Sequence, residues 1–491
     1  MSNNISVPPI RIVAANDHEI RNSGDFVLYW MIAQRRLNWN FALQRAVEYA
    51  EQLGKPLVIL EALRCGYRWA SERLHHFIVQ GMADNQRRAD ASGVFYYAYL
   101  EDEPRAGSGL LESLSRQAAV VVTDEFPCFF LPQMVAAAAD RVGCRMELID
   151  GNGLLPLRAA DRVFPLAHSF RRFLQKTLPE HLAHVPQAAP LTRLAGHAPA
   201  NLPADLQRKW PPMSPTTLVR DTSYLQRLPI DHQVLPSSIT GGSRAGEVRL
   251  SEFIAGGLDD YGERRNHPDD DKASGLSPYL HFGHISVHQV FHDVMSHDGW
   301  TPGDQATKAT GSREGWWNAS PSVESFLDEL ITWRELGYNM SWQRADYDQY
   351  QSLPDWALQT LQRHARDPRP YVYDLSQFEA AETHDEIWNA AQRQLVREGR
   401  VHNYLRMLWG KKILHWSHSP QEALAIMIEL NNKYALDGRN PNSYSGIFWV
   451  LGRYDRAWGP ERQVFGKIRY MTSENTARKV RLKEYLERFS V

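Results

Sequence analysis

Five short apolar segments, separated by stretches with helical periodicity, constrain the first third of this chain more than any other feature. Several of them are continuous apolar runs, the pattern of strands buried on both faces of a parallel sheet. Strands that alternate with helices in this way build an α/β domain, so we predict a doubly wound, Rossmann-like parallel sheet. No GxGxxG motif follows the first strand, which leaves a dinucleotide site there without support. The segments are 25–32, 56–62, 94–100, 119–124 and 145–150.

The rest of the chain departs from that pattern. Residues 186–215 contain seven prolines, which rules out a long helix and indicates an ordered or semi-extended connector. An irregular excursion within one domain would give the same composition. Beyond residue 245, helical periodicity replaces the strand pattern, as in the segments 323–342, 384–399, 401–417 and 420–435. We therefore expect an α/β domain over 1–185, an interdomain linker over 186–244 and an all-helical domain over 245–491.

Charge and cysteine content exclude several classes of protein. Lys and Arg total 55 against 57 Asp and Glu, a net charge of −2, so the chain is no bulk polycation, but a local basic groove is compatible with it. The three cysteines lack close pairing and metal-ligand spacing, which favours a reducing compartment and predicts no metal site. A signal-peptide pattern and a run of about 18 apolar residues are both missing. We expect a cytoplasmic or nucleoid-associated protein with no membrane partner.

Tryptophan is unevenly distributed, because only three of the 15 tryptophans precede residue 200. Arg406, Trp409 and Trp416 recur at helical spacing and share one face of a predicted helix. Such a stripe usually packs in a core, but an arginine on a buried face needs an anionic partner. Asp437 is a candidate partner, in the stretch 431–442, although Asp-Gly and Asn-Pro turn chemistry explains part of that stretch without function.

Two other segments carry polar groups that suit ligand binding. Glu329 and Trp333 are four residues apart, so they project from the same side of a helix, where Glu329 could equally well be solvated. Ser274, Gly275 and Ser277 stand just before a proline and an apolar run. Exposed amides at such a helix start can hold phosphate, although serine before proline is also an ordinary cap.

The last 31 residues are basic, with eight Lys and Arg against four acidic residues, and Trp449 and Trp458 lie just upstream. Basic residues interleaved with aromatic rings suit a nucleic-acid surface, because phosphates supply affinity and rings stack on bases. A run of charged residues by itself is more often a solvated helix face than a nucleic-acid surface. The residues expected to form a basic rim are Lys467, Arg469, Arg478, Lys479, Arg481 and Lys483.

Together these segments closely resemble the class II cyclobutane pyrimidine dimer DNA photolyases of the photolyase/cryptochrome family. VHNYLRMLWGKKILHW, SPYLHFGHIS, FLDELITWREL and the segment 429–471 carry the resemblance, and DFVLYWMIAQRRLNWNFAL resembles the family's N-terminal segment. The resemblance implies an antenna-type α/β domain and a helical domain that binds FAD and DNA. It also implies a monomeric, light-driven carbon–carbon lyase, whose reduced anionic FAD passes an electron to a dimer flipped out of UV-damaged DNA and recovers it after the ring splits.

The resemblance also assigns roles to individual residues. The catalytic group corresponds to Glu329, Asn431, Arg406 and Asp437, of which the last three lie beside the flavin. The remaining FAD contacts correspond to Tyr261, Ser274, Gly275, Leu276 and Ser277. The electron relay to the flavin corresponds to Trp409, Trp388 and Trp416, assisted by Tyr373. The dimer and DNA contacts correspond to Glu329, Trp333, Met407, Trp449 and Arg469.

Four positions depart from the family's pattern. His415 stands where an acidic residue is common, Asn403 where glycine is usual, and Asn432 and Asn440 where aspartates are common. No motif identifies an antenna chromophore of the deazaflavin or folate type. The alternatives are a cryptochrome-like blue-light photoreceptor, a (6-4) photolyase and a flavin-free DNA-binding protein. Retention of the expected dimer contacts favours repair, and these contacts lack the histidine pattern of (6-4) enzymes.

Overall fold

The computed structural model describes residues 6–490 and divides into two compact units. Unit 1 comprises Met1–Ala160, Thr177–Leu250 and Leu276–Asp293. Unit 2 comprises Asp161–Lys176, Ser251–Gly275 and Val294–Val491. Both units are therefore discontinuous in sequence. The domain boundaries at residues 185 and 244, which follow composition rather than contacts, stay a prediction.

Unit 1 is built around a six-stranded sheet with the strand order β1-β6-β5-β2-β3-β4. Neighbouring strands are parallel, except that β1 runs antiparallel to β6 at one edge. The predicted doubly wound sheet is confirmed, and all five predicted strands agree with the observed bounds to within one residue. The three-residue edge strand β1 escaped prediction because it is too short to show a period. The strands are β1 (Ile12–Ala14), β2 (Phe26–Met31), β3 (Leu57–Leu63), β4 (Phe95–Leu100), β5 (Ala118–Asp124) and β6 (Arg145–Ile149).

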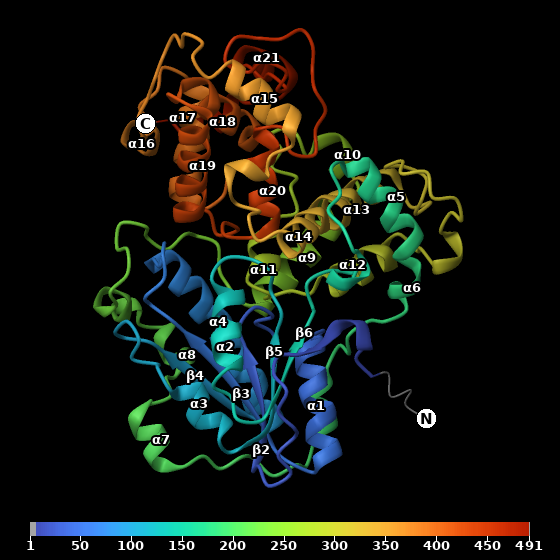
Figure 1. Cartoon of the computed structure of the whole chain (residues 1–491), viewed down its shortest axis with the longest axis vertical. Helices are drawn as coiled ribbons and strands as arrows, with labels where there is room; N and C mark the ends of the chain where they lie inside the picture. The colour runs from blue at the N-terminus through green and yellow to red at the C-terminus, as the bar shows by residue number, and fades with distance from the viewer. Residues whose placement is uncertain (1–5, 491) are drawn as a thin grey trace. The chain divides into compact units, whose positions relative to one another are not determined.

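Helices connect the parallel strands, as crossover connections require. Helix α1 (Phe41–Leu53) packs along β2, β5 and β6, while α2 (Glu72–Ser92) packs along β3 and β4 (Figure 1). Asn40 and Ser71 cap their N-termini through side-chain oxygens, and both helices end at a glycine with positive φ. The other helices of unit 1 are α3 (Leu110–Ser115), α4 (Leu131–Ala139), α6 (Pro179–Leu182), α7 (Ala204–Lys209), α8 (Pro215–Leu218) and α11 (Ser277–His281). Helices α9 (Ser243–Gly256) and α12 (Val287–His297) cross the division between the units.

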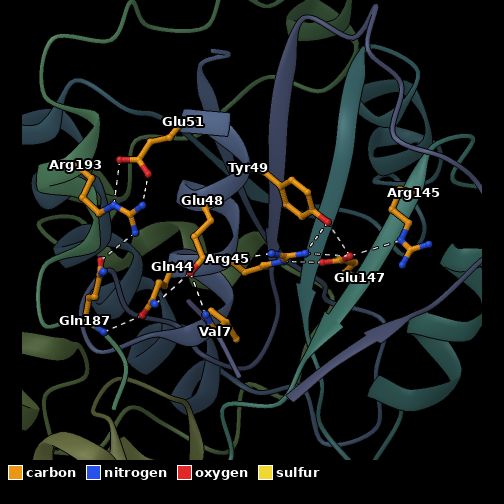
Figure 2. Close-up of polar contacts among 10 residues, drawn as sticks. All are labelled: Val7, Gln44, Arg45, Glu48, Tyr49, Glu51, Arg145, Glu147, Gln187 and Arg193. Atoms are coloured by element: carbon orange, nitrogen blue, oxygen red, sulfur yellow. Dashed lines mark hydrogen bonds and ion pairs between the residues drawn. The ribbon is translucent and has the colours of Figure 1, made fainter. Parts of the chain in front are cut away.

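A polar network fixes α1 to the sheet (Figure 2). The Tyr49 hydroxyl donates to Glu147 Oε1 at 2.7 Å, and Arg45 Nε donates to Glu147 Oε2 at 2.9 Å. Burial, followed by the hydrogen bond to Glu147, raises the pKa of Tyr49 to about 12. The tyrosine therefore stays a donor at neutral pH, and the Glu147 carboxylate on β6 is paired although it is almost fully buried.

The proline-rich segment is anchored to the same helix rather than free. The backbone N–H of Gln187 donates to Gln44 Oε1 at 2.9 Å, and Arg193 Nε donates to Glu51 Oε1 at 3.0 Å (Figure 2). These contacts hold the segment against α1, and its helices, such as α7 and α8, are short. The segment is ordered and belongs to unit 1.

Asp124, at the carboxyl end of β5, organises the edge of the sheet where a doubly wound fold would place a ligand. Its Oδ2 accepts the backbone N–H groups of Ile32, Ala33 and Gln34 at 2.8 to 2.9 Å. The Tyr29 hydroxyl donates to its Oδ1 at 2.7 Å. The backbone donors that would cradle a phosphate in a glycine-rich turn are therefore occupied by a side chain, in agreement with the missing fingerprint.

Unit 2 is built from helices and loops in the described part of the chain, which confirms the predicted all-helical domain. Helices α17, α18, α19 and α20 pack on one another, and α14 packs on α20 (Figure 1). Within residues 6–490, the structure contains no helix long and apolar enough to cross a membrane. The helices are α5 (Ala167–Thr177), α10 (Tyr261–Arg264), α13 (Pro321–Leu327), α14 (Arg334–Gln343), α15 (Asp355–Arg363), α16 (Leu375–Glu379), α17 (Glu386–Glu398), α18 (Asn403–Trp416), α19 (Pro420–Tyr434), α20 (Pro441–Val450), α21 (Ser473–Lys479) and α22 (Lys483–Arg488).

Candidate active site

The helix predicted over 323–342 contains an irregular turn at two of the predicted site residues. Between α13 and α14 lies η6 (Asp328–Trp333), a π-helical turn. Glu329 and Trp333 both belong to this turn and are both partly exposed, while their neighbours Leu330 and Ile331 are buried. A π turn widens a helix locally and is frequent at functional sites. The two predicted side chains therefore share an irregular, solvent-accessible part of an otherwise buried helix.

Glu329 is held by an arginine that the sequence did not single out. Arg265 Nη1 lies 2.5 Å from Glu329 Oε1, and the Arg265 guanidinium lies 5.4 Å from the centroid of the Tyr261 ring. The Glu329 side chain is 31% exposed, so one carboxylate can bind Arg265 and still face a ligand. Burial, with the charge of Glu329 next in importance, raises the pKa of Tyr261 to about 12. The only sequence signal for Arg265 was its spacing of four residues from Tyr261.

The predicted phosphate-binding run, 274–277, contains residues of both units in the sequence. Ser274 and Gly275 belong to unit 2, and Leu276 and Ser277 belong to unit 1. Gly275 has φ +67°, a conformation that glycine adopts without strain. Ser277 is the first residue of α11, so the predicted helix start is observed. Because α11 has five residues, we expect backbone amides rather than a long helix dipole to contribute there.

Arg406 and Asp437 form the predicted ion pair. Arg406 Nη2 lies 3.1 Å from Asp437 Oδ1 and 3.3 Å from Oδ2. The expectation that this arginine is buried was wrong, because its side chain is 25% exposed. Arg406 belongs to the first turn of α18, whereas Trp409, almost one turn later, is only 3% exposed. The charge pair therefore lies at the accessible end of a helix whose middle is buried.

Asn431, at the end of α19, is buried and held by its neighbours. Its Nδ2 donates to Ser443 Oγ at 2.7 Å. The next residue, Asn432, uses both ends of its amide: Nδ2 donates to the Tyr444 hydroxyl at 3.1 Å, and Oδ1 accepts the backbone N–H of Arg439 at 2.8 Å. Asparagine thus fits this position better than the aspartate common in the resembled family, because a carboxylate has no N–H to donate.

The other three departures have separate structural explanations. Asn440 accepts the backbone N–H of Asn442 at 2.9 Å and so caps α20. Asn403 is exposed at the first residue of α18. His415 packs against Phe465 with ring centroids 5.3 Å apart. Burial lowers the pKa of His415 to about 4, so the position carries an uncharged ring at neutral pH.

The three predicted relay tryptophans form a series of ring contacts, in which Trp388 touches both Trp409 and Trp416. The ring centroids of Trp409 and Trp388 are 6.5 Å apart, and those of Trp388 and Trp416 are 6.2 Å apart. Trp388 and Trp416 are buried almost completely. Tyr373 lies at the outer end, 5.7 Å from Trp416. Gln392, which the sequence did not single out, accepts the indole N–H of Trp409 at 2.9 Å.

A second aromatic cluster surrounds Trp449 on α20. The Arg469 guanidinium lies 5.5 Å from the Trp449 ring and 4.1 Å from the Trp458 ring, and Arg469 Nε donates to Asp455 Oδ2 at 3.2 Å. Lys411 Nζ lies 4.8 Å from the Trp449 ring. Burial lowers the pKa of Lys411 to about 7. The sequence had not singled out Lys411, because a lysine inside a helix usually reaches solvent.

Met407, the remaining predicted lesion contact, and the predicted basic rim lie on separate segments of the chain. Met407 is half-buried beside Arg406 on α18. Arg478 and Lys479 are exposed in the last turn of α21. Several of the predicted rim residues carry acidic partners, which reduces the local positive charge. The pairs are Lys467 with Glu461, Arg469 with Asp455 and Arg481 with Asp270.

Comparison with known proteins finds relatives that match nearly the whole chain. A protein named deoxyribodipyrimidine photo-lyase from Methanothermobacter thermautotrophicus is 33% identical over 479 residues, 97% of each chain. A protein of the same name from Arabidopsis thaliana is 31% identical, over 99% of this chain and 94% of its own. A third from Potorous tridactylus is 30% identical, over 98% of this chain and 84% of its own. No family model matches the chain.

Two solved structures share the fold. A class III photolyase from Agrobacterium tumefaciens aligns with a TM-score of 0.65 and 19% identity, over 95% of this chain and 86% of its own. A cryptochrome from Synechocystis sp. aligns with a TM-score of 0.66 and 15% identity, over 94% of this chain and 88% of its own. At these identities the likeness is one of fold.

Proposed function

This chain belongs to the photolyase/cryptochrome family, and on that premise we propose that it splits cyclobutane pyrimidine dimers in UV-damaged DNA by a light-driven reaction of the class II type. The observation that carries the proposal is the match of nearly the whole chain to relatives named photo-lyase. It favours repair over the cryptochrome-like alternative. The class II assignment is supported by the sequence segments around Arg406 and Glu329.

The family generally binds FAD, and two features of this chain suit such a ligand. Arg334 Nη1 is buried and has no hydrogen-bond partner among residues 6–490. A buried cationic donor of this kind suits an anionic group such as a phosphate. The backbone at Gly275 has the positive φ that lets amide groups approach a phosphate closely. The residues proposed to bind the FAD phosphates are Arg334, Tyr261, Ser274, Gly275, Leu276 and Ser277.

Around the flavin ring, the chain supplies fixed charge and hydrogen bonds. When bound and reduced, FAD would supply the photoexcited electron that opens the dimer and then returns. Arg406 would offset the negative charge of the reduced ring, and Asp437 would hold the guanidinium in place. Asn431 would present its amide to the ring, oriented by the hydrogen bond to Ser443.

The lesion would be held by Glu329, Trp333, Met407 and Trp449. The Glu329 carboxylate accepts hydrogen bonds, and Arg265 fixes its position from the opposite side. Trp333 and Trp449 offer flat rings to the flipped bases. A damaged step costs less to unstack than an intact one, so flipping selects for the dimer. Arg469 would bind the DNA backbone near Trp449.

An electron relay follows from the same proposal. Trp409, Trp388 and Trp416 would carry an electron inward to reduce the flavin, with Tyr373 at the outer end. The ring contacts from Trp409 through Trp388 and Trp416 to Tyr373 support this order.

A monomeric state and a cytoplasmic or nucleoid-associated location stay predictions from the sequence, which identifies no antenna chromophore.

The proposed function is tested by repair in light and in darkness. The purified protein, with FAD bound and reduced, is mixed with an oligonucleotide that contains one cyclobutane dimer, and dimer loss is followed by chromatography. We expect loss under blue light and none in darkness. An oligonucleotide with a (6-4) lesion is the matched control and should stay unchanged. Absence of light-dependent dimer loss would contradict repair and favour a photoreceptor, whereas repair of the control alone would favour a (6-4) photolyase.

A further inference from the structure

Tyr373 and His384 form a closely coupled pair at the outer end of the tryptophan path. Tyr373 Oη lies 2.8 Å from His384 Nδ1, and the backbone N–H of His384 donates to the same Oη at 3.1 Å. Because the backbone N–H already occupies an acceptor site of the hydroxyl oxygen, the phenolic proton is free to point at Nδ1. The geometry therefore allows the phenol to donate to His384 when its imidazole is neutral and Nδ1 carries no proton.

The pair is in direct contact with Trp416. The ring centroid of Trp416 lies 5.7 Å from that of Tyr373 and 4.9 Å from that of His384. The backbone N–H of Tyr373 also donates to the carbonyl of Trp416 at 3.0 Å. Trp416 is buried, Tyr373 is half-buried and His384 is exposed. An electron passed from Tyr373 to Trp416 would thus cross one ring contact, and a released proton could reach solvent through His384.

The charges around Trp416 disfavour a lasting positive charge on its ring. Lys412 Nζ lies 5.0 Å from the Trp416 ring centroid and 3.1 Å from Asp385 Oδ2. A radical cation on Trp416 would place a second positive charge beside this ammonium, although Asp385 offsets part of the repulsion. After its proton leaves, Tyr373 is a neutral radical, and the positive charge lies on His384, which is exposed to solvent.

We propose that His384 Nδ1 accepts the phenolic proton in the step in which Tyr373 reduces the oxidised Trp416. The inference rests on the proposed function, which supplies the oxidised tryptophan. The Trp416 radical cation gains one electron and becomes neutral. Tyr373 loses one electron and its O–H proton, and His384 becomes an imidazolium. An external thiolate then returns one electron to the Tyr373 radical and becomes a thiyl radical, while His384 returns the proton.

The protonation state of His384 agrees with this role. Burial lowers the pKa of His384 below its ordinary value, so the ring is neutral at neutral pH and can accept a proton. The charged and titratable groups that act on it are Asp385, Lys412, Glu474 and His415. Acid protonates Nδ1 in advance, so the transfer should fail only once the pH falls below this lowered pKa of His384.

The test uses full-length protein loaded with FAD, a light flash, and time-resolved absorption and electron paramagnetic resonance. The wild-type protein should form a tryptophan radical and then a neutral tyrosyl radical. His384→Gln keeps a hydrogen-bond acceptor but cannot take a proton. We expect it to form the tryptophan radical normally and the tyrosyl radical at least about a hundredfold more slowly, the usual size of a positioned-base effect. In His384→Ala, added imidazole should restore the tyrosyl radical.

Two tyrosine variants assign the radical. Tyr373→Phe should abolish the tyrosyl signal. Tyr371→Phe, whose ring stacks on His384 with centroids 3.7 Å apart, should keep it. A tyrosyl radical that persists in Tyr373→Phe, or that forms at the wild-type rate in His384→Gln, would overturn the inference. A wild-type protein that forms no tryptophan radical would overturn the relay in the proposed function, and this inference with it.

Discussion

Trp388 and Trp409 stack in the centre of unit 2 with ring centroids 6.5 Å apart and ring planes inclined by only 3°. The Trp388 indole N–H donates to the backbone carbonyl of Trp409 at 3.0 Å, which fixes one ring relative to the other. Offset-stacked pairs of this kind also occur in ordinary cores. Two neighbouring indole rings in a fixed orientation nevertheless suit the transfer of an electron from ring to ring.

Trp388→Phe should slow photoreduction of the flavin strongly, because phenylalanine is far harder to oxidise than tryptophan. The lost hydrogen bond and the smaller ring should also reduce the free energy of unfolding by about 1–3 kcal/mol. The measurements are bleaching of oxidised flavin under blue light and urea denaturation. Trp356→Phe, a half-buried tryptophan on α15 outside the path, is the matched control. Equal photoreduction rates in the two variants would contradict the relay.

Glu329→Ala should lower dimer repair more than FAD content. A hydrogen bond to a charged group contributes about 1.5–3 kcal/mol, so affinity for dimer-containing DNA should fall by about tenfold or more. The loss also frees Arg265, whose guanidinium no longer has its carboxylate partner. DNA binding, repair yield and flavin absorbance are measured in parallel. Glu484→Ala removes an exposed carboxylate elsewhere in unit 2 and should leave all three unchanged, and a loss of FAD as large as the loss of repair would contradict the assignment.

Asp437→Asn should affect flavin retention more than folding. The ion pair with Arg406 is partly exposed, and pairs of this kind contribute at most about 1 kcal/mol to stability. Arg406, however, would lose the group that fixes it beside the flavin. We expect an unfolding free energy within about 1 kcal/mol of the wild type and faster FAD release after dilution. Unchanged release together with a large loss of stability would assign the pair to the fold alone.

We expect the buried Lys411 to make the free energy of unfolding depend on pH. Its ammonium is fully buried, its Nζ donates to the carbonyl of Val450 at 2.6 Å, and burial lowers its pKa to about 7. An unfolded lysine has a pKa of about 10.4, so between these values the unfolded chain binds a proton that the folded chain has lost. Stability should therefore rise with pH through this interval.

Lys411→Met isolates this contribution. Relative to the variant, the wild-type protein should gain unfolding free energy between pH 7 and pH values near 10, as measured by urea denaturation at several pH values. Lys433→Met, at a partly exposed lysine that pairs with Glu379, is the control and should not reproduce the effect. Parallel profiles for wild type and Lys411→Met would contradict the lowered pKa.

The fold was predictable from sequence where the pattern is local. Strand β5 has seven consecutive buried residues. Buried strands of this kind are recognisable in the sequence as continuous apolar runs, and their observed bounds agree with the prediction to within one residue. The π turn at Asp328–Trp333 was not predictable, because the sequence around it keeps an ordinary helical period. The edge strand β1 depends on pairing with β6, more than 130 residues away, and carries almost no signal of its own.

The candidate site was predictable where a residue carries a recognisable motif. Arg406 and Asp437, 31 residues apart, meet as expected. Arg265, Gln392 and Lys411 were missed because each acquires its role from a tertiary contact. The Arg265–Glu329 contact, for example, joins residues 64 positions apart, and the spacing of Arg265 from Tyr261 does not mark it as the partner of Glu329. The burial of Lys411 likewise depends on α20 packing over α18.

The most direct test of this account compares repair by three proteins whose flavin has been chemically reduced beforehand: the wild type, Trp409→Phe and Glu329→Ala. With the relay bypassed, Trp409→Phe should repair dimers in blue light at nearly the wild-type yield, while Glu329→Ala should remain impaired and all three should be inactive in darkness. If Trp409→Phe is as impaired as Glu329→Ala, or if the wild type loses no dimers in light, the proposed division between electron relay and lesion binding is wrong.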